Sequence, residues 1–532
     1  MCLAKPPAPE PPAPPSIASS TVRTIALAAL LIALGNIASR FLGLGRVAVI
    51  AYFFGRSTEV DAFTAAWTIP ITVYDLLING AISAALIPVF SEYAEGDQRE
   101  FWQIVSGVIN VALLALASVV LVLVWQAPAV VGVLVQASRA EMIPLTVTLV
   151  RWLLPAVVLM GLSGLLTATL YARQQFLLPA FASAVFNVGI IVGAILLHQQ
   201  LAIFSLAVGV LLGALAQVLL QLPGLRGMVY RPVLSLSHPA VRRVLWLYAP
   251  VALGISFSMV GTLLDRWLAS GFVTALATMQ YATTLIQFPL GLVAAAVSLA
   301  VLPTLSRQAA SGDEAAFRQT LAMGIKVVLL FVLPAMFGLA MLAQPITALL
   351  FERGAFGAAD TAITALALLL YLPSLPAAAI DQLLIFAFYA RKNTLTPNLV
   401  QGAAILIYLA TALLLLASTQ LGFLALVLAN AAQWIGHALL MWWLLRRQVA
   451  LGGLRLGEAA AKALLACLMM VVAVAALQAG LHGVLPAPHP LLVLLVAGGG
   501  GALLYLGASI ALRVEALVFF TDAVRRKLGR AA

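Results

Sequence analysis

Charge and cysteine are both scarce in this chain. Of its 532 residues only 9% are Asp, Glu, Lys or Arg, whereas 63% are hydrophobic. Its two cysteines, Cys2 and Cys467, provide neither a disulfide framework nor a metal-ligand spacing. No polar stretch is long enough to form a water-soluble domain. The composition therefore excludes a soluble globular protein and predicts one polytopic membrane domain.

Motifs of catalysis are missing as well. The sequence contains no Gly-rich phosphate loop followed by Lys and Ser or Thr, no paired catalytic carboxylates and no His/Cys metal spacing. We expect the five histidines, including His198, His238, His482 and His489, at helix ends or in loops. The sequence therefore predicts neither an ATPase nor a metalloenzyme, and we expect that the protein is not an enzyme.

Long apolar runs make up most of the chain. Windows of about 20 residues, the length that crosses a bilayer as a helix, detect fourteen of them. They lie near 23–54, 60–91, 102–125, 143–172, 176–197, 201–222, 244–270, 273–305, 320–350, 361–390, 396–417, 421–445, 460–481 and 490–517. We therefore expect an all-α membrane protein of about fourteen transmembrane helices.

Basic residues are unevenly divided between the connections of these helices. Most lie in the even-numbered connections, among them Arg173, Arg226, Arg242, Arg243, Arg307, Arg391, Lys392, Arg446 and Arg447. The opposite connections hold only Arg56, Arg139 and Arg353. The positive-inside rule then predicts that both termini are cytoplasmic. The same asymmetry explains the net charge of +11 without any binding of nucleic acid.

Two motifs recur at an offset of about 216 residues. Tyr171-Ala172-Arg173 is repeated as Tyr389-Ala390-Arg391, and Ala85-Leu86-Ile87-Pro88 is echoed by Ala300-Val301-Leu302-Pro303. At about 36 residues per helix this offset holds six helices, and an even number preserves orientation, which predicts two parallel repeats. The expected parts are a disordered Pro-rich cytoplasmic tail (1–21), an N-lobe (22–222), a C-lobe (223–446), two further helices (447–517) and a basic cytoplasmic tail (518–532).

Two arginines of the first apolar run are the main candidates for a binding site. A charge near the bilayer centre costs about 2.5 to 3.5 kcal/mol and persists mainly where it meets a cavity, a partner or a substrate. Arg40 and Arg46 flank Gly43 and Gly45, which would allow a bend that turns both guanidinium groups toward one cavity, with Ser39 on the face of Arg46. Such a pair suits a phosphate or diphosphate.

Other roles for these charges remain open. Arg40 and Arg46 could instead pair with carboxylates such as Asp61 or Asp75 and hold one lobe together. Asp61 could be a gating or proton-responsive carboxylate, or an anion that favours the N-terminus of its own helix. Asp265 and Arg266 could form structural pairs with neighbours, or Asp265 could bind a coupling cation.

The motifs together resemble the MurJ (MviN) family of lipid II flippases, in the multidrug/oligosaccharidyl-lipid/polysaccharide exporter superfamily. The segments that carry the resemblance are SRFLGLGRVAVIAYFFG at 39–55, VDAF at 60–63, NGAISAALIPVFSEY at 79–93, LYARQQFLLPAF at 170–181, LLDRWLAS at 263–270, LLFERGAF at 349–356 and FYARKNTLTP at 388–397. The resemblance implies that two lobes enclose a cationic cavity and that the last two helices form a groove for a polyprenyl tail.

The resemblance also implies roles for individual residues. Ser39, Arg40 and Arg46 would contact the head group, Asp61 matches an important acidic residue, and Asp265 resembles an acid that is associated with a sodium ion in some members. We expect Asp61, Asp265 and Arg266 to serve in gating or coupling. The chain departs from the family pattern at Val47 and Asn79, where acidic residues are usual, and at Tyr74 and Thr284, where arginines are expected. Two of four cavity arginines are therefore missing, which leaves the exact cargo open.

We therefore predict an inner-membrane flippase that moves undecaprenyl-diphosphate-linked lipid II from the cytoplasmic to the periplasmic leaflet by alternating access. The alternatives are a flippase for another polyprenyl-linked glycan, a cation-coupled exporter of small molecules, or a membrane scaffold that does not transport. A sodium ion or the membrane potential could supply the energy. Expected partners are the lipid substrate, the bilayer and proteins of cell-wall synthesis, and we expect a monomer.

Overall fold

The computed structural model describes residues 19–233, 238–450 and 452–517 of the chain. Every regular element in these ranges is a helix, which confirms the predicted all-α class. Eleven helical segments of this described part are long and apolar enough to cross a membrane, or twelve if one bent pair counts as a single span. The runs predicted at 60–91 and 244–270 are helical but are not among them, so the count of fourteen stays a prediction.

A first group of helices precedes residue 226. It comprises α1 (Ser19–Phe54), α2 (Thr58–Tyr74), η1 (Asp75–Asn79), η2 (Ile82–Leu86), α3 (Ile87–Ala94), α4 (Gln98–Trp125), α5 (Ala127–Leu134), η3 (Ala137–Met142), α6 (Ile143–Leu153), α7 (Pro155–Ala172), α8 (Leu177–Leu201), α9 (Phe204–Gln221) and η4 (Leu222–Leu225). α1 begins inside the tail predicted at 1–21, because its helix already includes residues 19–21. The rest of that tail lies outside the described residues.

A second group follows, and a short third group ends the described chain. The second comprises α10 (Pro239–Ser270), α11 (Ala275–Pro289), η5 (Leu290–Ala294), α12 (Ala295–Ser311), α13 (Glu314–Met341), α14 (Ala343–Phe351), α15 (Ala358–Tyr371), α16 (Ser374–Ala390), α17 (Leu395–Ser418) and α18 (Leu424–Gln448). The third comprises α19 (Leu456–Val484), α20 (Pro490–Val493), η6 (Leu494–Gly498) and α21 (Gly499–Ala511). The basic tail predicted at 518–532 lies outside the described residues.

Side-chain caps fix where several of these helices begin. The Ser57 hydroxyl accepts from the amide of Val60 at the start of α2, and Asp97 accepts from the amide of Arg99 at the start of α4. Asp313 caps α13 in the same way. Each cap satisfies an amide that the first helical turn leaves without a partner, which stabilises the helix by about 1 kcal/mol. Short polar residues therefore end the loops, and apolar runs form the spans.

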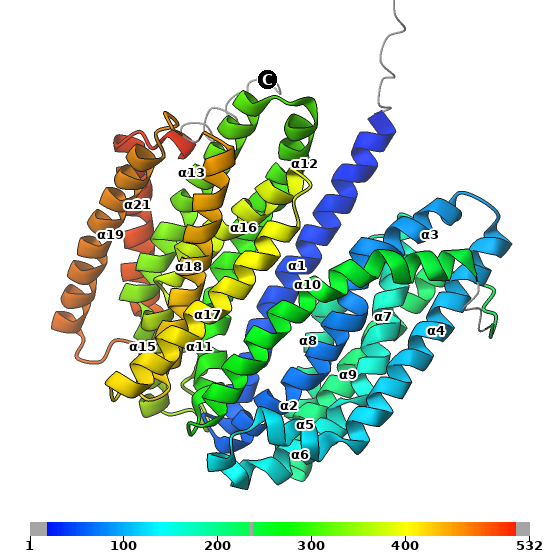
Figure 1. Cartoon of the computed structure of the whole chain (residues 1–532). Helices are drawn as coiled ribbons and strands as arrows, with labels where there is room; N and C mark the ends of the chain where they lie inside the picture. Colours follow the sequence, from blue (N-terminus) through cyan, green and yellow to red (C-terminus); the bar gives the residue numbers. More distant parts are fainter. Residues whose placement is uncertain (1–18, 234–237, 451, 518–532) are drawn as a thin grey trace, which may run out of the picture.

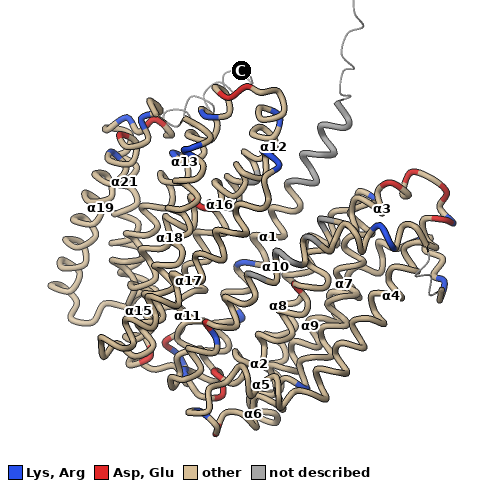
Figure 2. The backbone as a smooth tube through the Cα atoms, viewed as in Figure 1, with Lys and Arg blue, Asp and Glu red and all other residues tan. Residues whose placement is uncertain are grey.

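The two large groups lie side by side, with α1 and α10 between them (Figure 1). They meet at the end where α1 leads into α2, and they spread apart toward the opposite end. α19 and α21 pack on the outer side of the second group, against α13. Lys and Arg gather toward the spread end (Figure 2), which the charge asymmetry predicts to be cytoplasmic. The orientation itself stays a prediction.

Matched local features agree with the predicted parallel repeat. The guanidinium of Arg173 lies 5.0 Å from the ring centre of Trp102, and that of Arg391 lies 5.6 Å from the ring centre of Phe317. The two Tyr-Ala-Arg motifs end α7 and α16, and the residue after each motif, Gln174 or Lys392, has a positive φ. The π-helical turns η1 and η5 also occupy corresponding positions. The repeat and the lobe boundaries stay predictions that these features support.

Candidate functional site

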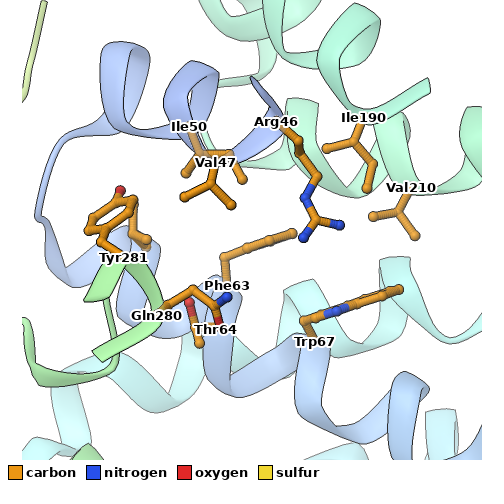
Figure 3. A pocket seen from close by; sticks show the side chains of 11 residues that line it. Arg46, Val47, Ile50, Phe63, Thr64, Trp67, Ile190, Val210, Gln280 and Tyr281 are labelled. Carbon is orange, nitrogen blue, oxygen red and sulfur yellow. The ribbon is translucent and has the colours of Figure 1, made fainter. Parts of the chain in front are cut away.

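Arg46 lies in a pocket between the two helix groups. Its side chain extends from α1, and its guanidinium lies among Phe63, Trp67, Ile190 and Val210 (Figure 3). The pocket has a volume of about 90 Å³ and is also lined by Val47, Ile50, Val60, Thr64, Gln280 and Tyr281. Within the described structure Arg46 forms no salt bridge and donates no hydrogen bond. The alternative that Arg46 pairs with Asp61 or Asp75 is therefore not found.

A guanidinium in this environment favours a bound anion. Among the residues that the structure describes, no carboxylate lines this pocket, and most of its lining is apolar. A charged group that leaves water without a partner carries a large free-energy cost, which an anionic ligand would offset through paired hydrogen bonds. The geometry of Arg46 therefore agrees with the predicted binding of a phosphate or diphosphate.

Arg40 does not share this pocket. α1 is one continuous helix through Gly43 and Gly45. Instead, Nη1 of Arg40 donates to the backbone carbonyl of Gln287 at 3.1 Å. A Cβ atom on Gly291, in η5, would overlap the guanidinium of Arg40. The two arginines point to different places because six residues place them on different helix faces.

Ser39 is half-buried and takes part in packing between helices. Its backbone carbonyl accepts a hydrogen bond of 3.3 Å from Nδ2 of Asn187, on α8. It does not line the pocket of Arg46. Of the three predicted head-group residues, Arg46 alone lines this pocket, and Arg40 contacts the second helix group.

Asp61 connects the two helix groups. It is buried in the first turn of α2, and its Oδ1 accepts from the backbone amide of Ala277 at 2.8 Å. Ala277 lies in the first turn of α11, where amides have no helical partner and the helix dipole favours a negative charge. One prediction was that Asp61 favours the N-terminus of its own helix. The hydrogen bond that its carboxylate accepts is at the N-terminus of α11, which belongs to the other helix group.

Further contacts close the same end of the interface. Nε of Arg56 lies 2.9 Å from Oδ1 of Asp360, and its Nη1 donates to the hydroxyl of Thr274. The hydroxyl of Tyr281 donates to the carbonyl of Gly55 at 2.6 Å. These contacts and Asp61 form what we call the interlobe seal. The sequence indicates only a loop position for Arg56, because its partners lie more than 200 positions away.

Backbone contact within the seal requires glycine. The amide of Ala355 donates to the carbonyl of Tyr52 at 2.8 Å. A Cβ on Gly354 would overlap this carbonyl, and a Cβ on Gly55 would overlap the carbonyl of Ala355. Both glycines also have positive φ angles. The two helix groups therefore touch here at backbone distance, without space for an intervening molecule.

Asp265 and Arg266 line a separate polar cavity of about 270 Å³ in the second group. Oδ1 of Asp265 accepts from the hydroxyl of Tyr408 at 2.8 Å, whereas the buried Nε of Arg266 has no partner among the described residues. The other lining residues include Thr262, Thr283, Gln287, Tyr371, Gln401, Asn430 and Gln433. Asp265 therefore has a hydrogen-bond partner on α17, and both of its predicted roles stay predictions.

The residues at the two expected arginine positions provide no cation. The hydroxyl of Thr284 donates to the backbone carbonyl of Gln280 at 2.7 Å. The same hydroxyl accepts a hydrogen bond of 3.4 Å from Nε2 of the Gln280 side chain. Gln280 in turn lines the pocket of Arg46. The hydroxyl of Tyr74 lies close to Gly164 on α7. Arg46 is therefore the single charged residue of its pocket among the described lining residues.

The third helix group borders an apolar groove. The groove lies between α13, α19 and α21, has a volume of about 310 Å³, and is lined by residues such as Leu330, Phe331, Met470, Val474 and Leu506. The hydroxyl of Tyr505 donates to the carbonyl of Leu330 at 2.6 Å and attaches α21 to α13. This groove lies where the resemblance implies a site for a polyprenyl tail.

One prediction about histidines is wrong. His437 lies inside α18, is buried, and forms a 2.8 Å hydrogen bond with Asp381 of α16. Sequence reasoning missed this pair because its members are separated by 56 positions and each lies in an apolar run. The sequence did carry one indication of this pair, because His437 lies in an apolar run with no loop residues beside it.

The chain matches one protein family over most of its length. The family model described as "Lipid II flippase MurJ" matches residues 50–488. The lipid II flippase MurJ of Burkholderia cenocepacia is 31% identical over 371 residues, covering 68% of this chain and 72% of that protein. A probable lipid II flippase MurJ of Haemophilus influenzae is 32% identical over 387 residues, covering 68% of this chain and 74% of that protein.

Solved structures share the fold. A structure titled "Lipid II flippase MurJ, inward closed conformation" superposes with a TM-score of 0.77 at 24% identity, covering 93% of this chain and all of that chain. An inward-facing multidrug resistance transporter of the MATE family gives a TM-score of 0.65 at 13% identity, covering 79% of this chain and 98% of that chain. With the family match and the two relatives, these findings identify the chain as a member of the lipid II flippase MurJ family.

Proposed function

We propose that this protein moves lipid II, the undecaprenyl-diphosphate-linked peptidoglycan precursor, from the cytoplasmic to the periplasmic leaflet. It is a multi-pass membrane protein, and its family is one of transporters rather than of enzymes. The relatives named above are lipid II flippases or probable ones. Location in the inner membrane, with both termini cytoplasmic, belongs to the same proposal.

The observation that carries the proposal is the position of Arg46. A lone guanidinium in a mostly apolar pocket between two helix groups supports binding of one anionic group at the interface that moves. The lipid II diphosphate is such a group. The apolar groove beside α13, α19 and α21 would receive the polyprenyl tail, because exposure of such a tail to water has a large free-energy cost.

Alternating access explains why the groups meet at one end only. The interlobe seal closes the end that is predicted to be periplasmic, while the groups spread at the other end. Lipid II would enter from the cytoplasmic leaflet, and the seal would then break as the spread end closes. The anionic head group moves outward, in the direction that an inside-negative potential favours.

The direct test replaces the native flippase of a bacterium. Cells depleted of their own flippase should grow when they express this chain, and lipid II should become accessible on the outer leaflet. Arg46→Ala should abolish both effects. Arg151→Ala is the matched control, because Arg151 is an exposed arginine of another span that contacts only a backbone carbonyl. Well-expressed protein that gives neither growth nor accessible lipid II would overturn the assignment of lipid II.

Two alternative cargoes remain as proposals. A pocket with one arginine instead of several would suit another polyprenyl-linked glycan, and the fold is shared with MATE transporters. A drug exporter should depend on Asp61 or Asp265 more than on Arg46, and should export small molecules in exchange for a cation.

A third alternative is a membrane scaffold that transports nothing. Such a scaffold should keep its biological effect after Arg40 and Arg46 are replaced.

Energy coupling and partners also belong to the proposal. Asp265 with nearby oxygen donors such as Thr262 and Asn430 fits the oxygen ligands that a hard cation like sodium prefers. No cluster of three or more His, Cys, Asp or Glu side chains occurs in the described ranges, so such an ion would rely on neutral oxygens. We further propose that the protein acts as a monomer beside proteins of cell-wall synthesis.

A further inference from the structure

Asp381 and His437 form a buried pair between α16 and α18. Nδ1 of His437 lies 2.8 Å from Oδ1 of Asp381. Asp381 is 1% exposed and His437 is 3% exposed. The second carboxylate oxygen, Oδ2, is buried and has no hydrogen-bond partner in the described structure. A carboxylate with one unsatisfied oxygen inside a helix interface calls for an explanation beyond packing.

Electroneutrality sets the number of protons that this pair holds. A carboxylate beside a neutral imidazole carries one net negative charge, and a carboxylic acid beside an imidazolium carries one net positive charge. Burial of either net charge is far more costly than burial of a neutral pair. The pair is neutral when it holds one proton more than a carboxylate beside a neutral imidazole. That proton lies on either Asp381 or His437. Loss of that proton would leave the Asp381 carboxylate charged and poorly solvated.

One face of α18 connects the pair to the polar cavity around Asp265. Asn430, Gln433 and His437 follow each other at spacings of three and four residues, so they share a helix face. Asn430 and Gln433 line the cavity, and His437 lies one turn further along the helix. Polar side chains therefore occupy the face of α18 between the cavity and the pair.

Charged and titratable groups on the surrounding helices have other partners or lie elsewhere. On α13, Lys326 pairs with Glu515, Glu314 pairs with Arg391, and Arg318 donates to the carbonyl of Gly452. On α15, Asp360 pairs with Arg56, and Tyr371 lines the cavity. On α10, Arg243 pairs with Glu92, Arg242 is exposed, and Tyr248 lies beside Gly80. Asp265 of the same helix accepts from Tyr408 of α17, and Arg266 lines the cavity. Arg307 of α12 is exposed, Tyr389 ends α16, and Arg446 and Arg447 end α18. The proton on the pair therefore decides its charge.

A change at this pair would reach the interface between the helix groups. α16 packs against η5, and Gly291 of η5 lies against the guanidinium of Arg40. Deprotonation of the pair would favour entry of water between α16 and α18, and so a different packing of α16. The surface on which Arg40 rests would then shift.

We propose that Asp381 and His437 together form a proton-binding site, loaded from the polar cavity, whose occupation controls the rearrangement of the second helix group. The identity of the substrate that this rearrangement moves rests on the proposed function, whereas the proton-binding site does not. Proton binding can be measured on the full-length protein without any lipid substrate.

The first measurement follows the protonation of His437 directly. We would record nitrogen NMR spectra of the full chain with labelled histidine, in lipid nanodiscs, between about pH 5 and pH 8. The resonance that disappears in His437→Gln should titrate, and Asp381→Asn should shift that titration. His198→Gln is the control, since this ring stacks on Phe53 and lies far from the pair in sequence. A His437 signal that keeps one protonation state throughout, in both backgrounds, would overturn the proposal.

The second measurement tests coupling to transport in proteoliposomes. An inwardly directed proton gradient should raise the outward movement of lipid II at least about fivefold, the lower end of coupling between two binding sites. His437→Gln should remove this acceleration, and His198→Gln should keep it. Equal rates with and without the gradient would overturn the coupling while the proposed function stands. Titration of His437 in a protein that moves no lipid II would instead leave the proton site in place and reject lipid II as cargo.

Discussion

The carboxylate of Asp61 accepts a hydrogen bond from the backbone amide of Ala277, 216 positions further along the chain, at 2.8 Å. This contact joins the first turn of α2 to the first turn of α11. It makes one buried side chain part of the interlobe seal, together with Arg56, Asp360 and Tyr281. The contact has to break whenever the protein opens toward that side.

Removal of this carboxylate should open the seal. A hydrogen bond to a charged group contributes about 1.5 to 3 kcal/mol, so Asp61→Ala should raise the open population by one to two orders of magnitude. A cysteine introduced by Thr64→Cys, in the pocket of Arg46, should then react faster with a membrane-impermeant thiol reagent added outside. Asp97→Ala, which removes only the cap of α4, should leave this rate unchanged. Equal rates for both variants would contradict the role of Asp61.

Arg56 and Asp360 should show a measurable but smaller coupling. Their side chains are 23% and 20% exposed, so water screens the pair and about 1 kcal/mol is expected. A double-mutant cycle with Arg56→Ala and Asp360→Asn, read through the same thiol reaction, isolates this value. Strictly additive effects of the two substitutions would mean that the ion pair does not stabilise the sealed state.

A side chain at Gly291 should displace Arg40. Gly291→Ala places a methyl group where the guanidinium now lies, so the hydrogen bond from Arg40 to Gln287 should be lost and lipid movement should fall. Gly132→Ala is the control, because Gly132 of α5 lines none of the described cavities and a Cβ there meets no atom within 4 Å. Combining Gly291→Ala with Arg40→Ala should add little further loss. A fully active Gly291→Ala protein would show that this approach has no role in transport.

Thr284→Arg should strengthen binding of a diphosphate. Thr284 contacts Gln280, which lines the pocket of Arg46, so a longer basic side chain could reach the same anion. An added charge-assisted hydrogen bond is worth about 1.5 to 3 kcal/mol, which corresponds to roughly tenfold to a hundredfold tighter binding. Titration with a short-chain polyprenyl diphosphate would measure it, with Thr283→Arg, which faces the other cavity, as the control. Unchanged or weaker binding by Thr284→Arg would show that the diphosphate does not bind near this helix.

The helices themselves were predictable from the sequence. Apolar runs of sufficient length can satisfy their backbone groups in a bilayer only as helices, so composition decides the class. The Tyr-Ala-Arg motifs at 171–173 and 389–391 also end helices, as expected. Such features depend on residues close together in sequence.

Contacts between distant segments were not predictable in the same way. A lone aspartate at the start of a helix looks like a local cap, and nothing near Asp61 in sequence indicates Ala277 as its partner. Arg40 and Arg46 were expected in one cavity, but the unbroken α1 keeps them on different faces. The pairing of Asp381 with His437 depends on how α16 packs on α18. Each of these facts arises from tertiary packing, on which a single sequence carries little information.

The pocket of Arg46 also bears on how the protein behaves when its lipids are removed. A guanidinium that has no counter-ion among the described residues should destabilise the protein when lipid is removed, and a bound anionic lipid would offset that cost. By mass action, a ligand present at a hundred times its dissociation constant adds about 2.7 kcal/mol to the stability of the folded form. Purification in delipidating detergent should therefore yield a more fragile sample than purification with native lipid, and an anionic diphosphate additive should restore its thermal tolerance.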